Sequence, residues 1–163
     1  IMSHFAKIGE NNIVLEVLYM ETSVSSTEGG IEDESVGLAH LRTHHGHDNW
    51  KRCSYNSRGG QHYAIDSNGD YVPDGSPGYR ANYPSEGWFW DETNEIFCEP
   101  RPNDKDGEPC ASWTMNTTTG LYDAPLTRPT PTQEEDDARK VWRWDESLYQ
   151  SDNTKGWLLV DQG

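Results

Sequence analysis

Three aromatic-rich phrases in the second half of the sequence resemble one another and limit what the chain can fold into. They read GWFWDETNEIFCEP at residues 87–100, ASWTMNTTTGLYDAP at residues 111–125 and VWRWDESLYQ at residues 141–150. Side chains of a β-strand alternate between two faces, and the Asp, Asn and Gly that follow the tryptophans favour turns. The phrases therefore predict three small aromatic β-hairpins.

The first phrase predicts a complete hairpin. Trp88 and Trp90 lie on one face of the first strand. Residues 91–94 have turn chemistry, and residues 96–98 form the return strand, with Phe97 opposite Trp90.

The other two phrases repeat this plan with changes. Met115 takes the place of the second tryptophan, and residues 116–120 form the turn of the second copy. In the third copy Trp142 and Trp144 precede the turn, and the return strand is delayed to residues 156–159. Proline-rich links join the copies and favour an extended, stiff spacing.

An isolated two-stranded hairpin is only marginally stable in water, and this chain has little apolar material to support one. Hydrophobic residues make up 33% of it, below the roughly 45–50% of typical globular domains. We therefore expect the tryptophans to divide between packing inside the hairpins and anchoring neighbouring subunits, as aromatic side chains often do. The residues predicted for the partner interface are Trp88, Trp90, Trp113, Trp142, Trp144 and Trp157. Three strand pairs of one ordinary small sheet remain an alternative.

The first half of the sequence predicts a different organisation. Residues 4–19 read as a β-hairpin whose turn is the Gly-Glu-Asn-Asn of residues 9–12. Acidic residues followed by leucines at helical spacing predict one short helix at residues 34–45, ended by Gly46. A short strand follows, and residues 57–84 are predicted to be a long ordered loop held by tyrosines.

These elements predict a mainly β, α+β protein. Residues 1–86 form a base with the N-terminal β-hairpin, the short helix and the long loop. Residues 87–163 form three aromatic hairpin modules joined by Pro-rich linkers.

The charge balance restricts the class of partner. The 13 basic and 28 acidic residues give a formal net charge of −15. Such a surface repels phosphate backbones and anionic lipid, so we expect neither nucleic-acid nor membrane binding. The alternative explanation of the same charge is an organism whose proteins are acidic in general. The odd number of cysteines without metal-ligand spacing predicts no disulfide framework and synthesis in a reducing cytoplasm.

Two groups of residues are weak candidates for metal binding. His40 and His44 are four residues apart on the predicted helix, which is ligand spacing, but Arg42 lies between them and the segment lacks the HExxH pattern. A solvated helix face explains the pair better.

The second group resembles the start of a calcium loop. Asp66, Asn68 and Asp70 place oxygen ligands at alternate positions, but Pro77 stands at the twelfth position, where an EF-hand needs a glutamate. Turns rich in Asp and Asn look the same without an ion. We expect no metal and no cofactor. Neighbouring carboxylates of a strand point to opposite faces and do not converge on one substrate, so we expect no catalytic residues.

The order of motifs resembles the small virion structural proteins of marine cyanophages and related marine phages. The resemblance covers nearly the whole chain. It lies in MSHFAKIGENNIVLEVL at residues 2–18, ESVGLAHLRTHHGHDNWKRCSYNSRGGQHY at residues 34–63, YRANYP at residues 79–84 and WRWDES at residues 142–147. Residues 84–88 depart from the family pattern, and residues 134–137 and 151–155 look like insertions.

The resemblance implies a non-enzymatic protein of the virion, made in the host cytoplasm. It would be an accessory protein on the particle exterior that decorates or cements the capsid, in a symmetric multi-copy assembly with other virion proteins. A neck or tail position, with or without receptor or glycan binding, is the alternative. A small metal-dependent enzyme that uses His40 and His44 is a third reading.

Overall fold

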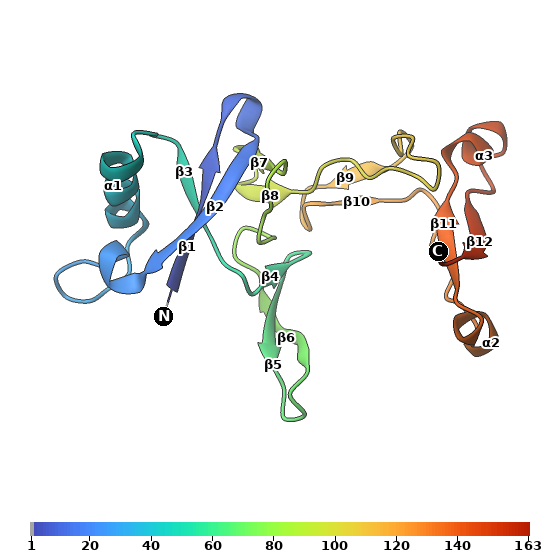
Figure 1. The fold of residues 1–163 in the computed structure, drawn as a ribbon, viewed down its shortest axis with the longest axis horizontal. Helices are drawn as coiled ribbons and strands as arrows, with labels where there is room; N and C mark the ends of the chain where they lie inside the picture. The colour runs from blue at the N-terminus through green and yellow to red at the C-terminus, as the bar shows by residue number, and fades with distance from the viewer. Residues whose placement is uncertain (1) are drawn as a thin grey trace. The chain divides into compact units, whose positions relative to one another are not determined.

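The computed structural model describes residues 2–163 and is built mainly of short β-strands (Figure 1). Among the described residues, twelve strands form five small antiparallel sheets, accompanied by three short α-helices. The predicted mainly β, α+β class is confirmed.

Contacts within the chain divide it into two compact units. The first unit comprises residues 2–100 and Asn116–Leu121, and the second comprises Arg101–Met115 and Tyr122–Gly163. The first aromatic hairpin therefore groups with the N-terminal part of the chain, which differs from the predicted division at residue 86.

The first unit is organised around the sheet β2-β1-β3. The predicted N-terminal hairpin is β1 (Met2–Ile8) and β2 (Val14–Glu21), joined through the 3-10 turn η1 (Glu10–Asn12). Asn11 and Asn12 adopt positive φ angles of 56° and 59°, which asparagine tolerates better than most residues. Strand β3 (Trp50–Cys53) pairs with the other edge of β1.

Helix α1 (Glu34–His45) has the bounds that the sequence predicts. Asp33 caps its first turn by accepting the backbone N–H of Ser35, and Gly46 ends it with a left-handed φ of 62°. Gly37 lets the helix approach the sheet closely, because a Cβ there would lie 2.4 Å from the Phe5 ring. Between β2 and α1 lies the short turn η2 (Thr22–Ser25).

The β2-β1-β3 sheet is covered on both faces. On one face Phe5 and Trp50 pack with Leu41 of α1. On the other face small and branched side chains of β1 and β2 pack with Trp90 and Phe97. The first aromatic hairpin belongs to the first unit because it completes this second core.

That hairpin consists of β7 (Phe89–Asp91) and β8 (Ile96–Cys98). The predicted pairing of Trp90 with Phe97 is confirmed, with the ring centroids 4.8 Å apart. The second hairpin consists of β9 (Thr114–Asn116) and β10 (Leu121–Asp123).

The segment predicted to be a long loop contains a three-stranded sheet. Its strands are β4 (Ser57–Arg58), β5 (Gln61–Ile65) and β6 (Tyr71–Pro77). Most of their side chains are exposed or half-buried, so the segment lacks the apolar alternation that marks a strand in sequence. The buried Asn82 anchors it, since its side-chain oxygen accepts the Gly59 N–H and its amide donates to the Phe97 and Thr119 carbonyls.

The second unit contains the third aromatic phrase. Strands β11 (Lys140–Trp144) and β12 (Trp157–Asp161) pair antiparallel, so the delayed return strand is confirmed. Helix α3 (Glu146–Ser151) occupies the connection between them, and α2 (Gln133–Asp137) precedes β11 at the other end of the pair (Figure 1).

Candidate functional site

The tryptophans predicted to contact partners lie mainly inside their own units. Trp90 and Trp144 are buried, at 1% and 3% exposure, and Trp88 is half-buried against the core around Trp90. Trp113, Trp142 and Trp157 are half-buried in the second unit. None of these six is exposed. The candidate interaction sites are a pocket that some of these tryptophans line and a surface that carries exposed tyrosines.

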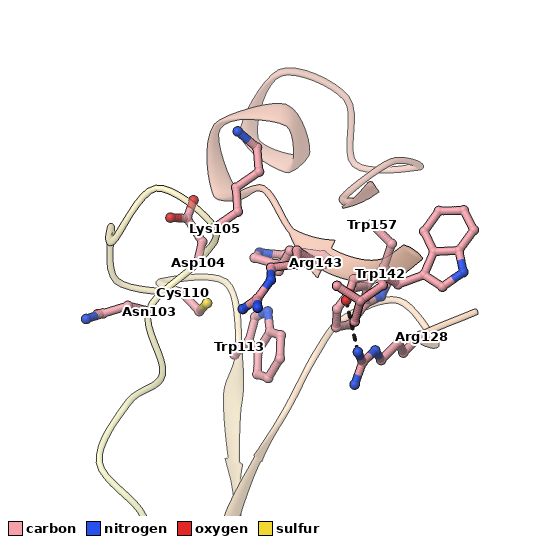
Figure 2. A pocket seen from close by; sticks show the side chains of 11 residues that line it. Asn103, Asp104, Lys105, Cys110, Trp113, Arg128, Trp142, Arg143 and Trp157 are labelled. Atoms are coloured by element: carbon pink, nitrogen blue, oxygen red, sulfur yellow. Dashed lines mark hydrogen bonds between the residues drawn. The ribbon is translucent and has the colours of Figure 1, made fainter. Parts of the chain in front are cut away.

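The second unit contains a pocket of about 280 Å³ that is lined by tryptophans and charged side chains (Figure 2). Four of the six predicted tryptophans meet there: one lies just before β9, two lie on β11 and one lies on β12. The aromatic and charged lining residues are Trp113, Trp142, Trp144, Trp157, Asp104, Lys105, Arg128 and Arg143. The fold thus brings together residues from the second and third aromatic phrases, from the delayed return strand and from the links that precede these two phrases.

Three of these tryptophans, Trp113, Trp144 and Trp157, form one contiguous cluster beside the pocket. The Trp144 ring lies 5.2 Å from that of Trp157 and 5.8 Å from that of Trp113, centroid to centroid, in edge-to-face geometry. Such pairs contribute roughly 0.5–1.5 kcal/mol beyond the area they bury. Gly156 permits this packing, because a Cβ there would lie 2.4 Å from the Trp144 ring.

The buried side chain of Glu146 holds the cluster in place by accepting hydrogen bonds. Its carboxylate accepts hydrogen bonds from Trp144 Nε1 at 2.8 Å, from the Ser112 N–H and hydroxyl and from the Gln150 amide. Burial raises the pKa of Glu146, but these hydrogen bonds outweigh it and hold the pKa below its ordinary value. The carboxylate is therefore charged at neutral pH.

A polar loop at residues 101–112 forms one wall of the pocket. Asp104 accepts the N–H groups of Asp106 and Glu108 through Oδ1 and that of Glu146 through Oδ2. Arg101 donates hydrogen bonds to the carbonyls of Cys110 and Trp113 and so links the start of the loop to the segment that leads into β9.

The first unit presents a tyrosine surface, defined here by His4 and five tyrosines. Their positions are Tyr19, Tyr55, Tyr63, Tyr71 and Tyr83. Tyr19, Tyr55 and Tyr71 are 68%, 60% and 50% exposed, respectively. The hollow between Tyr55, Tyr63, Tyr71 and Tyr83 has a volume of about 280 Å³.

Contacts among these rings hold the tyrosine surface together. The His4 ring lies 5.5 Å from Tyr55 and 5.4 Å from Tyr83, and its Nδ1 is 3.0 Å from the Tyr83 hydroxyl. Tyr63 and Tyr71 stack at 5.4 Å, and the Tyr71 hydroxyl donates to Asn56. Burial lowers the pKa of His4, which favours the neutral ring at neutral pH.

The metal candidates do not converge in the structure. His40 and His44 lie side by side on α1, with ring centroids 4.2 Å apart and no acidic or cysteine residue completing a set. Asp66 Oδ1 accepts the N–H groups of Asn68 and Asp70, which is turn geometry. Within residues 2–163 no group of three or more His, Cys, Asp or Glu could hold a metal ion.

The three cysteines are free and buried. Burial raises the pKa of Cys53 to about 12 and the pKa values of Cys98 and Cys110 to about 11. All three thiols are therefore protonated at neutral pH and are poor nucleophiles.

Sequence reasoning missed the cationic side of the pocket and two exposed tyrosines. Arg128 lies in a proline-rich link that the pattern marks only as a spacer, and Arg143 lies between two tryptophans that draw attention first. Tyr19 and Tyr55 lie at the ends of predicted strands, where the alternation of side chains does not predict whether a residue is buried or exposed. The one available signal was the density of tyrosines in the first half of the sequence.

Comparison of the chain with models of protein families, with curated proteins and with solved structures gave no match. Among residues 2–163, none of the helices has the length and apolar character needed to span a bilayer.

Proposed function

We propose that the protein is a non-enzymatic structural protein of a phage particle, an accessory component on the exterior that decorates or cements the capsid. The order of its sequence motifs suggests the setting. The structural observation that carries the proposal is the tyrosine surface of the first unit, where Tyr19, Tyr55 and Tyr71 are exposed. The rings of Tyr19 and Tyr55 contact His4, and Tyr71 lines the same hollow as Tyr55.

Tyrosine is enriched at protein interfaces, because its ring supplies contact area and its hydroxyl a hydrogen bond. Tyr19 also lies on β2, an edge strand of the β2-β1-β3 sheet. An edge strand presents unpaired backbone groups that can pair with a strand of another chain. Exposed aromatic rings beside an open sheet edge support docking onto another virion protein.

The charge supports an exterior position. A net charge of −15 is repelled by packaged nucleic acid, whereas it keeps many copies soluble until they assemble. The expected partners are other virion proteins, and the expected arrangement is a symmetric multi-copy assembly.

Mass spectrometry of purified particles of the encoding phage tests incorporation directly. We expect the protein among the particle components, in more copies for a capsid position than for a neck or tail position. Its complete absence from washed particles would overturn the proposal.

Surface variants test the tyrosine surface. We expect the triple change Tyr19→Ser, Tyr55→Ser and Tyr71→Ser to reduce binding to particles that lack the protein by at least about tenfold, since interface aromatics often contribute 2 kcal/mol or more each. Ile31→Ser is the matched control, because Ile31 is 71% exposed and is not part of this surface. Equal binding of the triple variant and the control would contradict the assigned surface.

A second candidate function is a receptor- or glycan-binding protein at the neck or tail. The tryptophan-lined pocket of the second unit favours it, because aromatic faces bind the C–H faces of sugar rings.

A further inference from the structure

Two indole N–H groups at the pocket of the second unit have no hydrogen-bond partner. Nε1 of Trp113 and Nε1 of Trp142 are both buried without an acceptor among residues 2–163, and both residues line the pocket. By contrast, Trp157 Nε1 donates to the Leu126 carbonyl at 2.9 Å. Both nitrogens are closed off from the surface, so these two residues offer a ligand in the pocket their rings and not their N–H groups.

The same pocket carries positive charge that no carboxylate neutralises. Arg128 and Arg143 line it, and neither forms an ion pair with any acidic residue of the described chain. Arg128 donates one hydrogen bond to the Trp142 carbonyl at 3.0 Å (Figure 2), and its guanidinium lies 5.6 Å from the Trp157 ring. In a chain of net charge −15, two unpaired guanidinium groups at one pocket favour an anionic ligand.

The other two charged side chains of the lining, Lys105 and Asp104, already have partners within the protein. Lys105 pairs with Asp106 at 2.8 Å and with Asp145 at 3.4 Å. Asp104 accepts three backbone N–H groups; burial raises its pKa, but these hydrogen bonds lower it overall, so it is ionised. An ionised Asp104 repels a bare polyanion but still accepts hydrogen bonds from hydroxyl groups. The lining therefore suits a ligand that combines one anionic group with hydroxyls.

We propose that this pocket binds an acidic saccharide unit, a sugar ring that carries a carboxylate or a sulfate. The C–H face of the ring stacks on an indole, and the anionic group accepts hydrogen bonds from Arg128 and Arg143. The volume of about 280 Å³ lies just below the roughly 300–1,000 Å³ of ligand pockets, so we expect a single ring to enter. This assignment goes beyond the proposed structural function and does not depend on where the protein sits in a particle.

Nuclear magnetic resonance of the full chain tests the ligand class, with the indole N–H signals of Trp113 and Trp142 as reporters. The probes are glucuronate, glucose 6-sulfate, neutral glucose and adenosine monophosphate. We expect the two signals to shift and saturate with glucuronate or glucose 6-sulfate and glucose to bind at least about tenfold more weakly, while the signals of Trp50 and Trp90 in the first unit stay fixed. Glucuronate and glucose 6-sulfate distinguish the carboxylate from the sulfate source.

Three outcomes would overturn the proposal. Equal binding of glucose would remove the role of the charge, tighter binding of adenosine monophosphate would assign a nucleotide site, and the absence of any shift would exclude a saccharide site.

Variants test the named donors. We expect Arg128→Ala with Arg143→Ala to weaken acidic-sugar binding at least tenfold, while Lys155→Ala, a cation that does not line the pocket, leaves it unchanged. Wild-type affinity in the double arginine variant would refute the proposal, even if particle incorporation had been shown.

Discussion

The tripeptide Trp-Asp-Glu occurs in both units with the same local hydrogen bond and different surroundings. Trp90 Nε1 donates to Glu92 in the first unit, and Trp144 Nε1 donates to Glu146 in the second. The Glu92 side chain is 67% exposed, whereas Glu146 as a residue is only 8% exposed. The two-residue spacing brings the indole N–H and the carboxylate together in both units. Only in the second unit is the glutamate buried, so only there does the contact belong to the core.

The central aspartate also leads to different structures. Oδ1 of Asp91 accepts the N–H groups of both Thr93 and Asn94 and starts a hairpin turn. Asp145 accepts the Leu148 N–H at 2.9 Å and caps α3. The same acceptor serves a turn or a helix, depending on the residues that follow it.

The cores around the two tryptophans differ in composition. Trp90 packs against Ala6, Ile8 and Val14 of a three-stranded sheet. Trp144 packs against Trp113 and Trp157, because the second unit lacks a comparable aliphatic face. Where this chain lacks an aliphatic sheet face, tryptophan rings packed against one another form the core instead.

The largest expected effect comes from removing either indole. We expect Trp90→Ala and Trp144→Ala each to lower the free energy of unfolding by about 3–5 kcal/mol, as for other large buried aromatics. Amide hydrogen exchange measures it, with lost protection in β1–β3 for Trp90→Ala and in β11 and β12 for Trp144→Ala. Unchanged protection of β11 and β12 would mean that the indole cluster is not the core of the second unit.

The two glutamates should differ more than the two tryptophans. We expect Glu146→Gln to cost about 1–3 kcal/mol, because the new amide NH₂ faces donors and leaves one unpaired. Glu92→Gln, at an exposed site, should change stability by no more than about 0.5 kcal/mol. Chemical denaturation measures the free energy of unfolding of both variants. Equal losses would show that burial of the glutamate does not set its contribution to stability.

Acid should weaken both units through carboxylates whose pKa values are lowered. Burial raises the pKa of Glu34, but hydrogen bonds from Arg80 and the Arg52 N–H and the charges of Arg80 and Lys51 lower it overall; the pKa of Glu146 is also lowered. A folded-state pKa below the unfolded value of 4.5 means that the unfolded chain binds protons first as the pH falls.

The stabilisation from these carboxylates is therefore fully present above about pH 4.5 and is lost as the pH falls through the lower folded-state pKa values. Thermal unfolding between pH 7 and pH 3 measures this loss. We expect Glu34→Gln to lower stability at pH 7 and to flatten the acid dependence. A melting temperature that rises on acidification would contradict the assigned pKa directions.

The smallest expected effect concerns the turns of the two hairpins. Glu95 and Gly120 both have positive φ, 54° and 68°, at the last turn position before the return strand. A left-handed conformation costs a non-glycine residue roughly 1–2 kcal/mol, and the flexibility of glycine offsets roughly 0.5–1 kcal/mol of that. We expect Glu95→Gly to raise stability by up to about 1 kcal/mol in thermal unfolding, and a fall would show that the Glu95 side chain stabilises the turn.

Local signals predicted local structure well. The acidic start, leucine spacing and Gly46 fixed the bounds of α1, and the alternating aromatics predicted β7–β8 with Trp90 opposite Phe97. The β4-β5-β6 sheet was missed because its side chains face solvent on most sides and leave no apolar pattern. Its anchor, Asn82, makes hydrogen bonds to residues far along the chain, which no local pattern encodes.

The sequence by itself determined the β-rich class, the hairpins, the helix and the Trp–Glu contacts, because each depends on residues within a few positions of one another. Only the tertiary structure decided that the tryptophans turn inward, that tyrosines remain exposed, and that Arg128 and Arg143 meet unpartnered indoles at one pocket. The physical reason is that burial and charge pairing depend on which distant segments pack together, and sequence spacing does not carry that information.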